Sequence, residues 1–433
     1  MVLLLACRPT QKDPNLLLIT LDTTRADHLG TYGYFRNTTP RIDALAPDAL
    51  VFDRCLVPMA VTLPSHTSMM TGVYPTEHGL LANNRGATNQ WVRAPLTTLA
   101  SWLAEGGYRT GGFVSGAPLR AGSGIEEGFQ TWSEPPVGTT VRRGDATTDE
   151  ALGFIGSGKG PFFAWLHLFD AHGGSAPPDS VQFEADDALS RWTRERAFTP
   201  TLTRGGDHAV PVERILDRYD AEIRFMDDQI GRIIDHGRRR GWWANTLVVI
   251  LGDHGEGLGQ HGLSAHGHIW EEQLQAPFLL LGPGVAPGRW PEPVSSADLV
   301  PTLLGRLALG GEGPLLGQVS GSDLLSGRRD RPVFSMSSAK ARRGHPKAVS
   351  LAEGSWRYIR ESDGSEHLFD LAVDPFELAD AVAAEPARIG AMGSLTRQIE
   401  DHQAARGRAF GAGGSEALPE QQADELRELG YVE

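Results

Sequence analysis

Residues 247–267, with the sequence LVVILGDHGEGLGQHGLSAHG, decide the fold class of this chain. The first five residues are apolar and three of them are β-branched, which is typical of a strand buried on both faces of a parallel sheet. We expect this strand to stop at Gly252, where the sequence changes from apolar to ionisable residues. Ligands of open α/β sheets bind beyond the carboxyl ends of the strands, so the stretch predicts a functional loop at that edge.

The loop after the strand is rich in residues that bind metals. They are Asp253, His254, Glu256, His261, His266 and His268. A carboxylate beside an imidazole suits zinc, manganese or a similar divalent ion. A lone Asp-His pair fits a turn cap with a solvated histidine equally well, but four histidines between residues 254 and 268 favour a site.

Length and composition restrict the class of protein. The 433 residues allow one large domain and a smaller one, and a hydrophobic fraction of 40% is typical of a globular chain. The net charge of −14 argues against nucleic-acid binding, which needs a basic surface. An anionic substrate remains compatible, because bound cations reverse the local field.

The two cysteines are Cys7 and Cys55, so a disulfide framework is excluded beyond a single bridge. Cys7 follows Leu-Leu-Ala, which resembles the cleavage box of bacterial lipoproteins. The apolar region before it is shorter than a signal peptide needs and no basic region precedes it, so a chance match is the alternative unless the true start lies upstream. We expect export to the periplasm or outer membrane, with a lipidated Cys7 attached to the membrane. No later segment reaches the roughly 18 apolar residues of a membrane span.

Two further buried strands are expected to deliver polar residues to the same edge. Residues 15–21 (NLLLITL) lead to Asp22, which could instead cap the next turn, and residues 161–169 (PFFAWLHLF) lead through His167 to Asp170 and His172. Thr62 comes just before a stretch with helical character, where an anion is favoured. A hydroxyl there is either a nucleophile activated by a metal or an N-cap.

The remaining expectations concern the surrounding elements. Residues 173–211 are expected to form a long substrate-side loop, and residues 219–236 an amphipathic helix on which Asp227 and Asp228 lie on a solvated face. Residues 332–337 and 356–360 read as strands of a small C-terminal antiparallel unit.

The ordered motifs resemble those of the sulfatase family of the alkaline phosphatase superfamily. They are the strand before Asp22, Thr62-Leu-Pro-Ser-His66, His167-Leu-Phe-Asp-Ala-His172 and the strand before Asp253-His254-Gly, with further matches at residues 74–79, 301–304, 368–375 and 426–432. The resemblance implies an α/β sandwich with a central, mostly parallel sheet flanked by helices and a small C-terminal α+β subdomain. The expected divisions are a signal or tether at 1–14, a catalytic domain at 15–325 and a C-terminal subdomain with a helical tail at 326–433.

The resemblance also implies the roles of the site residues. One divalent ion, zinc, manganese or calcium, would be held by Asp22, Thr62, Asp253 and His254. The expected contacts to substrate oxygens are Arg25, His66, His172 and His266. A second metal could be held by Asp170, His172 and His266, although their Asp-x-His spacing differs from the Asp-x-x-x-His of two-metal relatives.

Two departures from the family pattern bear on the activity. Thr62 and His66 stand where sulfatases carry the Cys or Ser that becomes formylglycine and its Arg, and residues 113–117 lack the Lys and His of a Gly-Lys-Trp-His segment. Thr23 replaces a second acid. A Thr nucleophile resembles phosphodiesterases, phosphonate hydrolases and phosphoethanolamine transferases.

These observations predict a metal-dependent hydrolase of sulfate- or phosphate-type esters, acting through Thr62 on a small-molecule, glycan or lipid substrate. The alternatives are a phosphoethanolamine-type transferase acting on a glycan or lipid, and a non-catalytic glycan-binding lipoprotein.

Overall fold

The structure, a computed structural model, describes residues 13–83, 88–90, 96–172, 177, 181–203, 209–307, 309, 315–327, 331–338, 347–411 and 415–417. Cys7 and the C-terminal motif at residues 426–432 lie outside the described residues.

The centre of the molecule is a nine-stranded sheet with the order β11-β2-β10-β9-β1-β6-β4-β5, to which β12 adds beside β2. Only β10 runs antiparallel to its neighbours, so the expected mostly parallel sheet is confirmed. The strands are β1 (Asn15–Leu21), β2 (Leu50–Leu56), β4 (Arg109–Val114), β5 (Thr131–Ser133), β6 (Phe162–Leu168), β9 (Thr246–Gly252), β10 (Gln275–Leu281), β11 (Gly288–Trp290) and β12 (Val294–Ser295).

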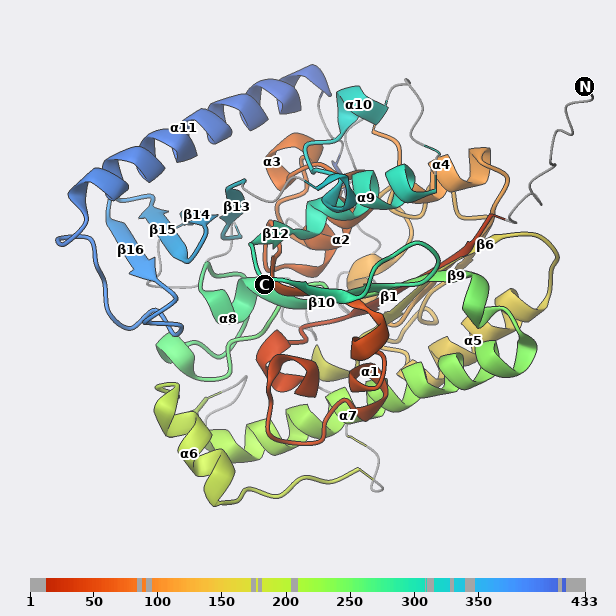
Figure 1. The fold of residues 1–433 in the computed structure, drawn as a ribbon, viewed down its shortest axis with the longest axis horizontal. Coiled ribbons are helices and arrows are strands. Elements are labelled where there is room, and N and C mark those ends of the chain that lie inside the picture. The colour runs from red at the N-terminus through yellow and green to blue at the C-terminus, as the bar shows by residue number, and fades with distance from the viewer. Residues whose placement is uncertain are drawn as a thin grey trace, which may run out of the picture.

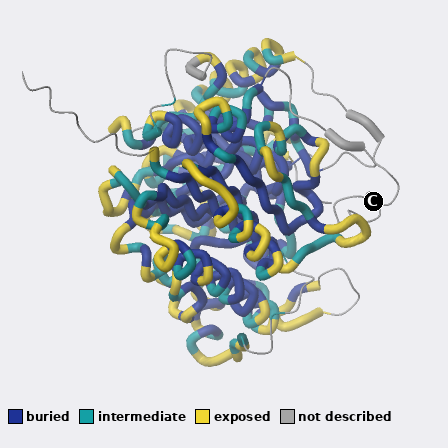
Figure 2. Tube along the Cα trace, turned by 90° about the vertical axis from the view of Figure 1, so that its right-hand side faces the viewer, coloured by how far each residue is buried: buried dark blue, intermediate teal, exposed yellow. Residues whose placement is uncertain are grey.

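Helices cover both faces of this sheet, because its central strands are apolar on both sides (Figure 1). Leu17 and Ile19 of β1 point into one core with α5 and α7, whereas Leu16 and Leu18 point into the other with α2, α4 and α9. Figure 2 shows this buried interior surrounded by exposed loops and helix surfaces. The helices are α1 (Pro40–Asp43), α2 (Thr62–Thr71), α3 (Pro75–His78), α4 (Leu99–Glu105), α5 (Gly144–Gly156), α6 (Asp187–Glu195), α7 (Val212–Arg240), α8 (Glu271–Leu274), α9 (Leu299–Arg306), α10 (Leu315–Gln318) and α11 (Pro386–Ala409).

A second sheet forms the expected small C-terminal antiparallel unit. It has the order β13-β14-β15-β16, and α11 lies along it (Figure 1). Its apolar side chains share a core with β2, α8 and β10, so the unit packs directly on the main domain. Its strands are β13 (Val333–Met336), β14 (Ala348–Glu353), β15 (Trp356–Glu361) and β16 (Glu366–Asp370).

Two expectations about local structure are wrong. The segment expected to be one long loop contains α6 and the strand pair β7 (Thr201–Leu202) and β8 (Val210–Pro211). Helix α6 forms because the Asp186 carboxylate accepts a hydrogen bond from the Leu189 N–H as its N-cap, and because Leu189 is buried. Asp227 is buried rather than solvated, because it accepts hydrogen bonds from backbone N–H groups of α1.

None of the helices in the part of the chain described here combines the length and the apolar character needed to span a bilayer.

Candidate active site

The sheet register brings the acids of two strand tips together. Leu21 of β1 is paired with Gly252 of β9 and with Leu168 of β6, so the next residues, Asp22 and Asp253, emerge side by side. The Asp22 N–H donates to the Leu168 carbonyl at 2.9 Å, and the Asp253 N–H donates to the Leu21 carbonyl at 3.2 Å. The two buried carboxyl groups therefore extend the hydrogen-bonded ladder of the sheet into the candidate site.

Thr62 lies at the start of α2, within the helix rather than before it. Val61 occupies the N-cap position, and the Leu63 N–H of the first turn donates to Asn83 Oδ1 at 2.7 Å, so the alternative of Thr62 as an N-cap does not apply. The Thr62 hydroxyl lies 3.4 Å from His254 Nε2. The Ser65 hydroxyl donates to the Asp253 carbonyl at 2.6 Å and ties the first turn of α2 to the tip of β9.

His254 presents a nitrogen lone pair to this hydroxyl. Its Nδ1 donates to the Gly255 carbonyl at 2.8 Å, which leaves Nε2 as the acceptor that faces Thr62. Burial, together with the neighbouring His266, lowers the pKa of His254 well below its usual value, so the ring is neutral. A neutral imidazole fixed through its other nitrogen is the form that binds a metal.

The two acids leave oxygen atoms for a cation. Asp253 Oδ1 accepts from the N–H groups of Thr23 at 2.9 Å and His254 at 2.8 Å, whereas Asp253 Oδ2 and Asp22 Oδ1 have no hydrogen-bond partner among the described residues. Burial raises the pKa of Asp22 and of Asp253 well above the usual value, and their mutual repulsion raises that of Asp253 further. Ligand atoms of Asp22, Asp253 and His254 lie within 4.8 Å of one another. Two carboxylates, an imidazole and a hydroxyl fit a divalent ion such as zinc or manganese.

His66 and His167 lie close to the two acids, and both rings contact protein groups. His66 donates from Nδ1 to the Thr62 carbonyl at 2.8 Å, and its Nε2 lies 3.1 Å from the Thr20 hydroxyl. Both ring nitrogens thus hold the start of α2 against β1. His167 Nε2 lies 3.2 Å from Asp22 Oδ2, and burial lowers the pKa of His167 to about 3. From the sequence we expected His167 at this edge but assigned it no role. In the structure His167 pairs with Thr20, two residues before Asp22, which brings its ring to the Asp22 carboxyl.

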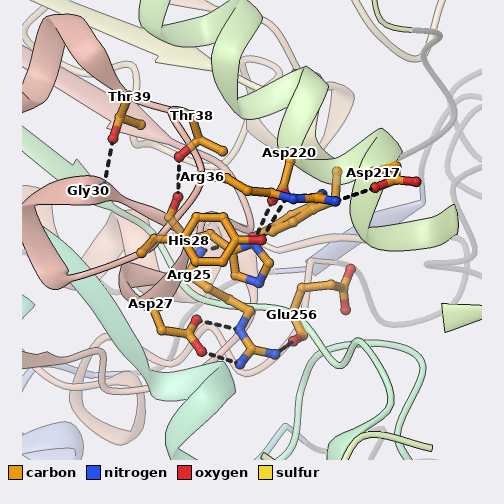
Figure 3. A network of polar contacts seen from close by, with 12 residues as sticks. Arg25, Asp27, His28, Gly30, Arg36, Thr38, Thr39, Asp217, Asp220 and Glu256 are labelled. Carbon is orange, nitrogen blue, oxygen red and sulfur yellow. Dashed lines mark hydrogen bonds and ion pairs between the residues drawn. The ribbon is translucent and has the colours of Figure 1, made fainter. Parts of the chain in front are cut away.

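The Arg25 guanidinium forms an ion pair with Asp27. Its Nε and one terminal nitrogen bind both oxygens of Asp27, and the other nitrogen donates to the Glu256 carbonyl (Figure 3). The side chain is buried, and no contact given by the described residues joins it to Thr62. Its expected role as an oxyanion contact therefore stays a prediction.

His266 and His172 lie beside the ligand set. The His266 ring centroid is 4.5 Å from that of His254 and 5.4 Å from that of His172. His172 in turn stacks on Phe169 at 4.4 Å. The two imidazoles therefore form a row of rings with His254, next to the ligand set.

Asp170 is not brought into one ligand group with these histidines. Its Oδ1 accepts from the Gly144 N–H at 3.1 Å, at the start of α5, and burial raises the pKa of Asp170 to about 6. Among the described side chains, the groups arranged to hold a metal are Asp22, Asp253 and His254, and His66, His167 and Asp253. The second metal at Asp170, His172 and His266 stays a prediction. His261 lies outside the centre, where it contacts Glu272 and stacks on Trp270.

The fold and these motifs have counterparts in known proteins. The family model for Sulfatase matches residues 14–309, and the chain belongs to this family of hydrolases. A choline-sulfatase of Rhizobium meliloti (strain 1021) is 34% identical over 172 residues. The match covers 39% of this chain and about a third (33%) of the length of the choline-sulfatase.

A sulfatase of Formosa agariphila is 23% identical over 87% of this chain and 86% of its own length. Among solved structures, the phosphonate monoester hydrolase of Agrobacterium radiobacter aligns with a TM-score of 0.68 and 20% identity over 90% of this chain and 96% of its own. The structural likeness extends across both the main sheet and the C-terminal unit, and it confirms the alkaline-phosphatase-like fold expected from the sequence.

Proposed function

We propose that this protein is a metal-dependent hydrolase of sulfate- or phosphate-type esters in which Thr62 is the nucleophile. The observation that carries the proposal is the position of the Thr62 hydroxyl, 3.4 Å from His254 Nε2 and next to the Asp22 carboxyl, at the start of a helix. A threonine with a purely structural role in an apolar core does not need an acid and an imidazole next to its hydroxyl. A hydroxyl placed among two acids and an imidazole is suited to become an alkoxide next to a cation.

Asp22, Thr62, Asp253 and His254 would hold the ion, which when bound would lower the pKa of the Thr62 hydroxyl and offset negative charge on the substrate oxygens. Thr62 Oγ1, having lost its proton to solvent, would attack phosphorus or sulfur, the bond from that atom to the leaving oxygen would break, and the departing alkoxide would take up a proton. His266, whose ring lies beside that of His254, and His172, whose ring lies beside that of His266, are the candidate donors of that proton. Water then attacks the ester on Thr62 and regenerates the hydroxyl.

Phosphodiesters and phosphonate esters are the substrates that this site favours. A sulfated Thr62 lacks the second hydroxyl through which a formylglycine hydrate expels sulfate, so water must attack the ester directly. Residues 113–117, at the tip of β4, contain no cation in place of the missing Lys and His, and the Ser115 hydroxyl there is paired with that of Thr147 at 2.7 Å. Each lost charged contact to a developing oxyanion costs on the order of 3 kcal/mol, or about a hundredfold in rate.

The decisive experiment compares kcat/KM for p-nitrophenyl sulfate and bis-p-nitrophenyl phosphate, each with zinc, manganese or calcium. We expect the diester to be preferred at least about tenfold with the best ion. A clear preference for the sulfate would contradict the assignment of substrate class. Hydrolysis of the diester releases p-nitrophenol and p-nitrophenyl phosphate in equal amounts without an added acceptor. This result distinguishes hydrolysis from transfer to a glycan or lipid.

Export with a lipidated Cys7 remains part of the proposal, and it rests on the sequence alone. Globomycin-sensitive processing, with loss of membrane association in Cys7→Ala, is the expected result for the protein expressed from its native locus.

A further inference from the structure

The residue after Asp22 has an unfavourable backbone conformation. Thr23 has a φ of +48°, in the left-handed region that β-branched residues rarely adopt. Such a conformation is unfavourable and persists only where the surrounding structure imposes it. Contacts around the tip of β1 must therefore hold Thr23 in place.

One side chain from α7 supplies those contacts. The Tyr219 hydroxyl donates to the Thr23 carbonyl at 2.6 Å and accepts from the Arg25 N–H at 2.9 Å. Tyr219 is 5% exposed, and burial raises its pKa, so the hydroxyl keeps its proton. The Tyr219 hydroxyl therefore bridges two successive peptide groups of the turn, the one between Thr23 and Thr24 and the one between Thr24 and Arg25.

The helix that carries Tyr219 is itself fixed to the same segment. Asp220, the next residue, binds His28 Nδ1 at 2.7 Å and Arg36 at 2.7 Å (Figure 3). The Tyr219 ring packs edge-on against the His28 ring, with centroids 4.9 Å apart. The phenol is thus held by α7 on one side and by the residues after the turn on the other.

The turn determines how the metal ligands point. With Thr23 at positive φ, its N–H donates to Asp253 Oδ1 at 2.9 Å, and this bond leaves Asp253 Oδ2 for the ion. We propose that Tyr219 is a positioning residue of the metal site: its hydroxyl holds the Thr23 turn, which sets the relative orientation of Asp22 and Asp253. This inference rests on the proposed function, because it takes these acids to be the ligands.

The test uses Tyr219→Phe in the full-length protein, with Tyr34→Phe as the matched control. The Tyr34 hydroxyl is also buried and donates to Asp220 Oδ2 at 2.7 Å, but it makes no contact with the Thr23 turn among those described. Affinity for Zn²⁺ is measured by competition with a chelator, and the Co²⁺ absorption spectrum reports ligand geometry. We expect the affinity to fall about tenfold or more in Tyr219→Phe and less than about threefold in Tyr34→Phe, as for other groups that orient metal ligands.

Two further readouts separate positioning from a general loss of stability. The metal-free melting temperatures of the two variants should be similar. Turnover of Tyr219→Phe should recover most of its native value at saturating metal, because the hydrogen bonds described for the Tyr219 hydroxyl go to the backbone of Thr23 and Arg25 rather than to a ligand side chain. In a Thr23→Gly background, where positive φ carries no Cβ penalty, Tyr219→Phe should weaken Zn²⁺ binding less than in the native chain.

Equal Zn²⁺ affinity in Tyr219→Phe and the native protein, with Asp253→Ala binding more weakly, would overturn the role of Tyr219 and leave the proposed site intact. Unchanged affinity in Asp253→Ala would instead reject the metal site itself. An equal loss with and without Thr23→Gly would overturn the link through the turn. If Tyr219→Phe does not fold, the double variant with Thr23→Gly is expected to fold and bind Zn²⁺, and its failure would contradict the proposal.

Discussion

Thr62 and Asp253 lie in one buried cluster, yet their substitution by alanine should have different consequences. Thr62→Ala removes the hydroxyl beside His254 and leaves Asp22, Asp253 and His254 to bind the ion. We expect it to retain metal while turnover falls by roughly a thousandfold or more, as for the loss of other nucleophiles. Asp253→Ala removes a charged ligand and should lower both metal content and turnover.

Metal content by elemental analysis and turnover of the preferred ester check this contrast. Thr62→Ser, which keeps a hydroxyl at the start of α2, is the control and should retain part of the activity. Near-native turnover of metal-loaded Thr62→Ala would remove Thr62 from the mechanism, and full metal content in Asp253→Ala would place the ion elsewhere.

At the scale of elements, α1 depends on a carboxylate from another helix. No side chain of its own caps it, and Asp227 of α7 accepts from the N–H groups of Arg41 at 2.8 Å and Ile42 at 2.9 Å. We expect Asp227→Ala to lower the free energy of unfolding by about 1–2 kcal/mol, measured by denaturant titration, because two buried donors lose their acceptor. Asp228→Ala is the control, since that side chain is 40% exposed, and it should change stability by less than about 0.5 kcal/mol.

The effect of Asp227 should also depend on pH. Burial raises the pKa of Asp227 to about 7, above that of an unfolded aspartate, so folding binds a proton here. Its contribution to stability is therefore greatest at low pH and declines as the pH rises from about 4 through 7. The loss measured for Asp227→Ala should be larger at pH 5 than at pH 8, and the opposite order would show that the charged carboxylate is the better acceptor.

The sequence predicted the elements whose signal is local and missed those that depend on distant partners. The apolar runs of β1, β6 and β9 identified the buried strands, and the residues after them identified Asp22, Asp253 and His254. Nothing in the local pattern shows that Asp227 caps α1, about 185 residues earlier, or that Tyr219 bonds to Thr23, 196 residues earlier. Helix α6 was missed because its short amphipathic pattern follows a stretch rich in proline and glycine.

At the scale of the whole molecule, a buried arginine joins the C-terminal sheet to the main domain. Arg357 of β15 binds Glu271 of α8, and its Nε lies 3.2 Å from the buried Glu377. We expect Arg357→Met to destabilise the protein by about 3–5 kcal/mol, because it leaves the buried Glu377 without a cation and Glu271 with Arg54 as its remaining one. Thermal and denaturant unfolding measure the loss, which should appear in one transition since the two units share a core.

Arg360→Met is the matched control on the same strand. Arg360 pairs with Glu400 of α11 at the surface, and both side chains are partly exposed, so its loss should cost less than about 1 kcal/mol. Equal effects of the two substitutions, or a separate transition for the C-terminal sheet in the native protein, would contradict a buried connection.

The central position of β1 determines when the protein can become active during synthesis. Its hydrogen-bonding partners are β6 and β9, which begin at residues 162 and 246, so the first long apolar strand to leave the ribosome waits for both of its neighbours. Contacts of such long sequence separation form late, because the loop entropy is lost before the pairing energy is gained. Asp22 is made early, but its companions at residues 253 and 254 follow more than half a chain later. Until then the nascent chain carries an unpaired, aggregation-prone strand, and capture of the ion marks the end of folding rather than its beginning.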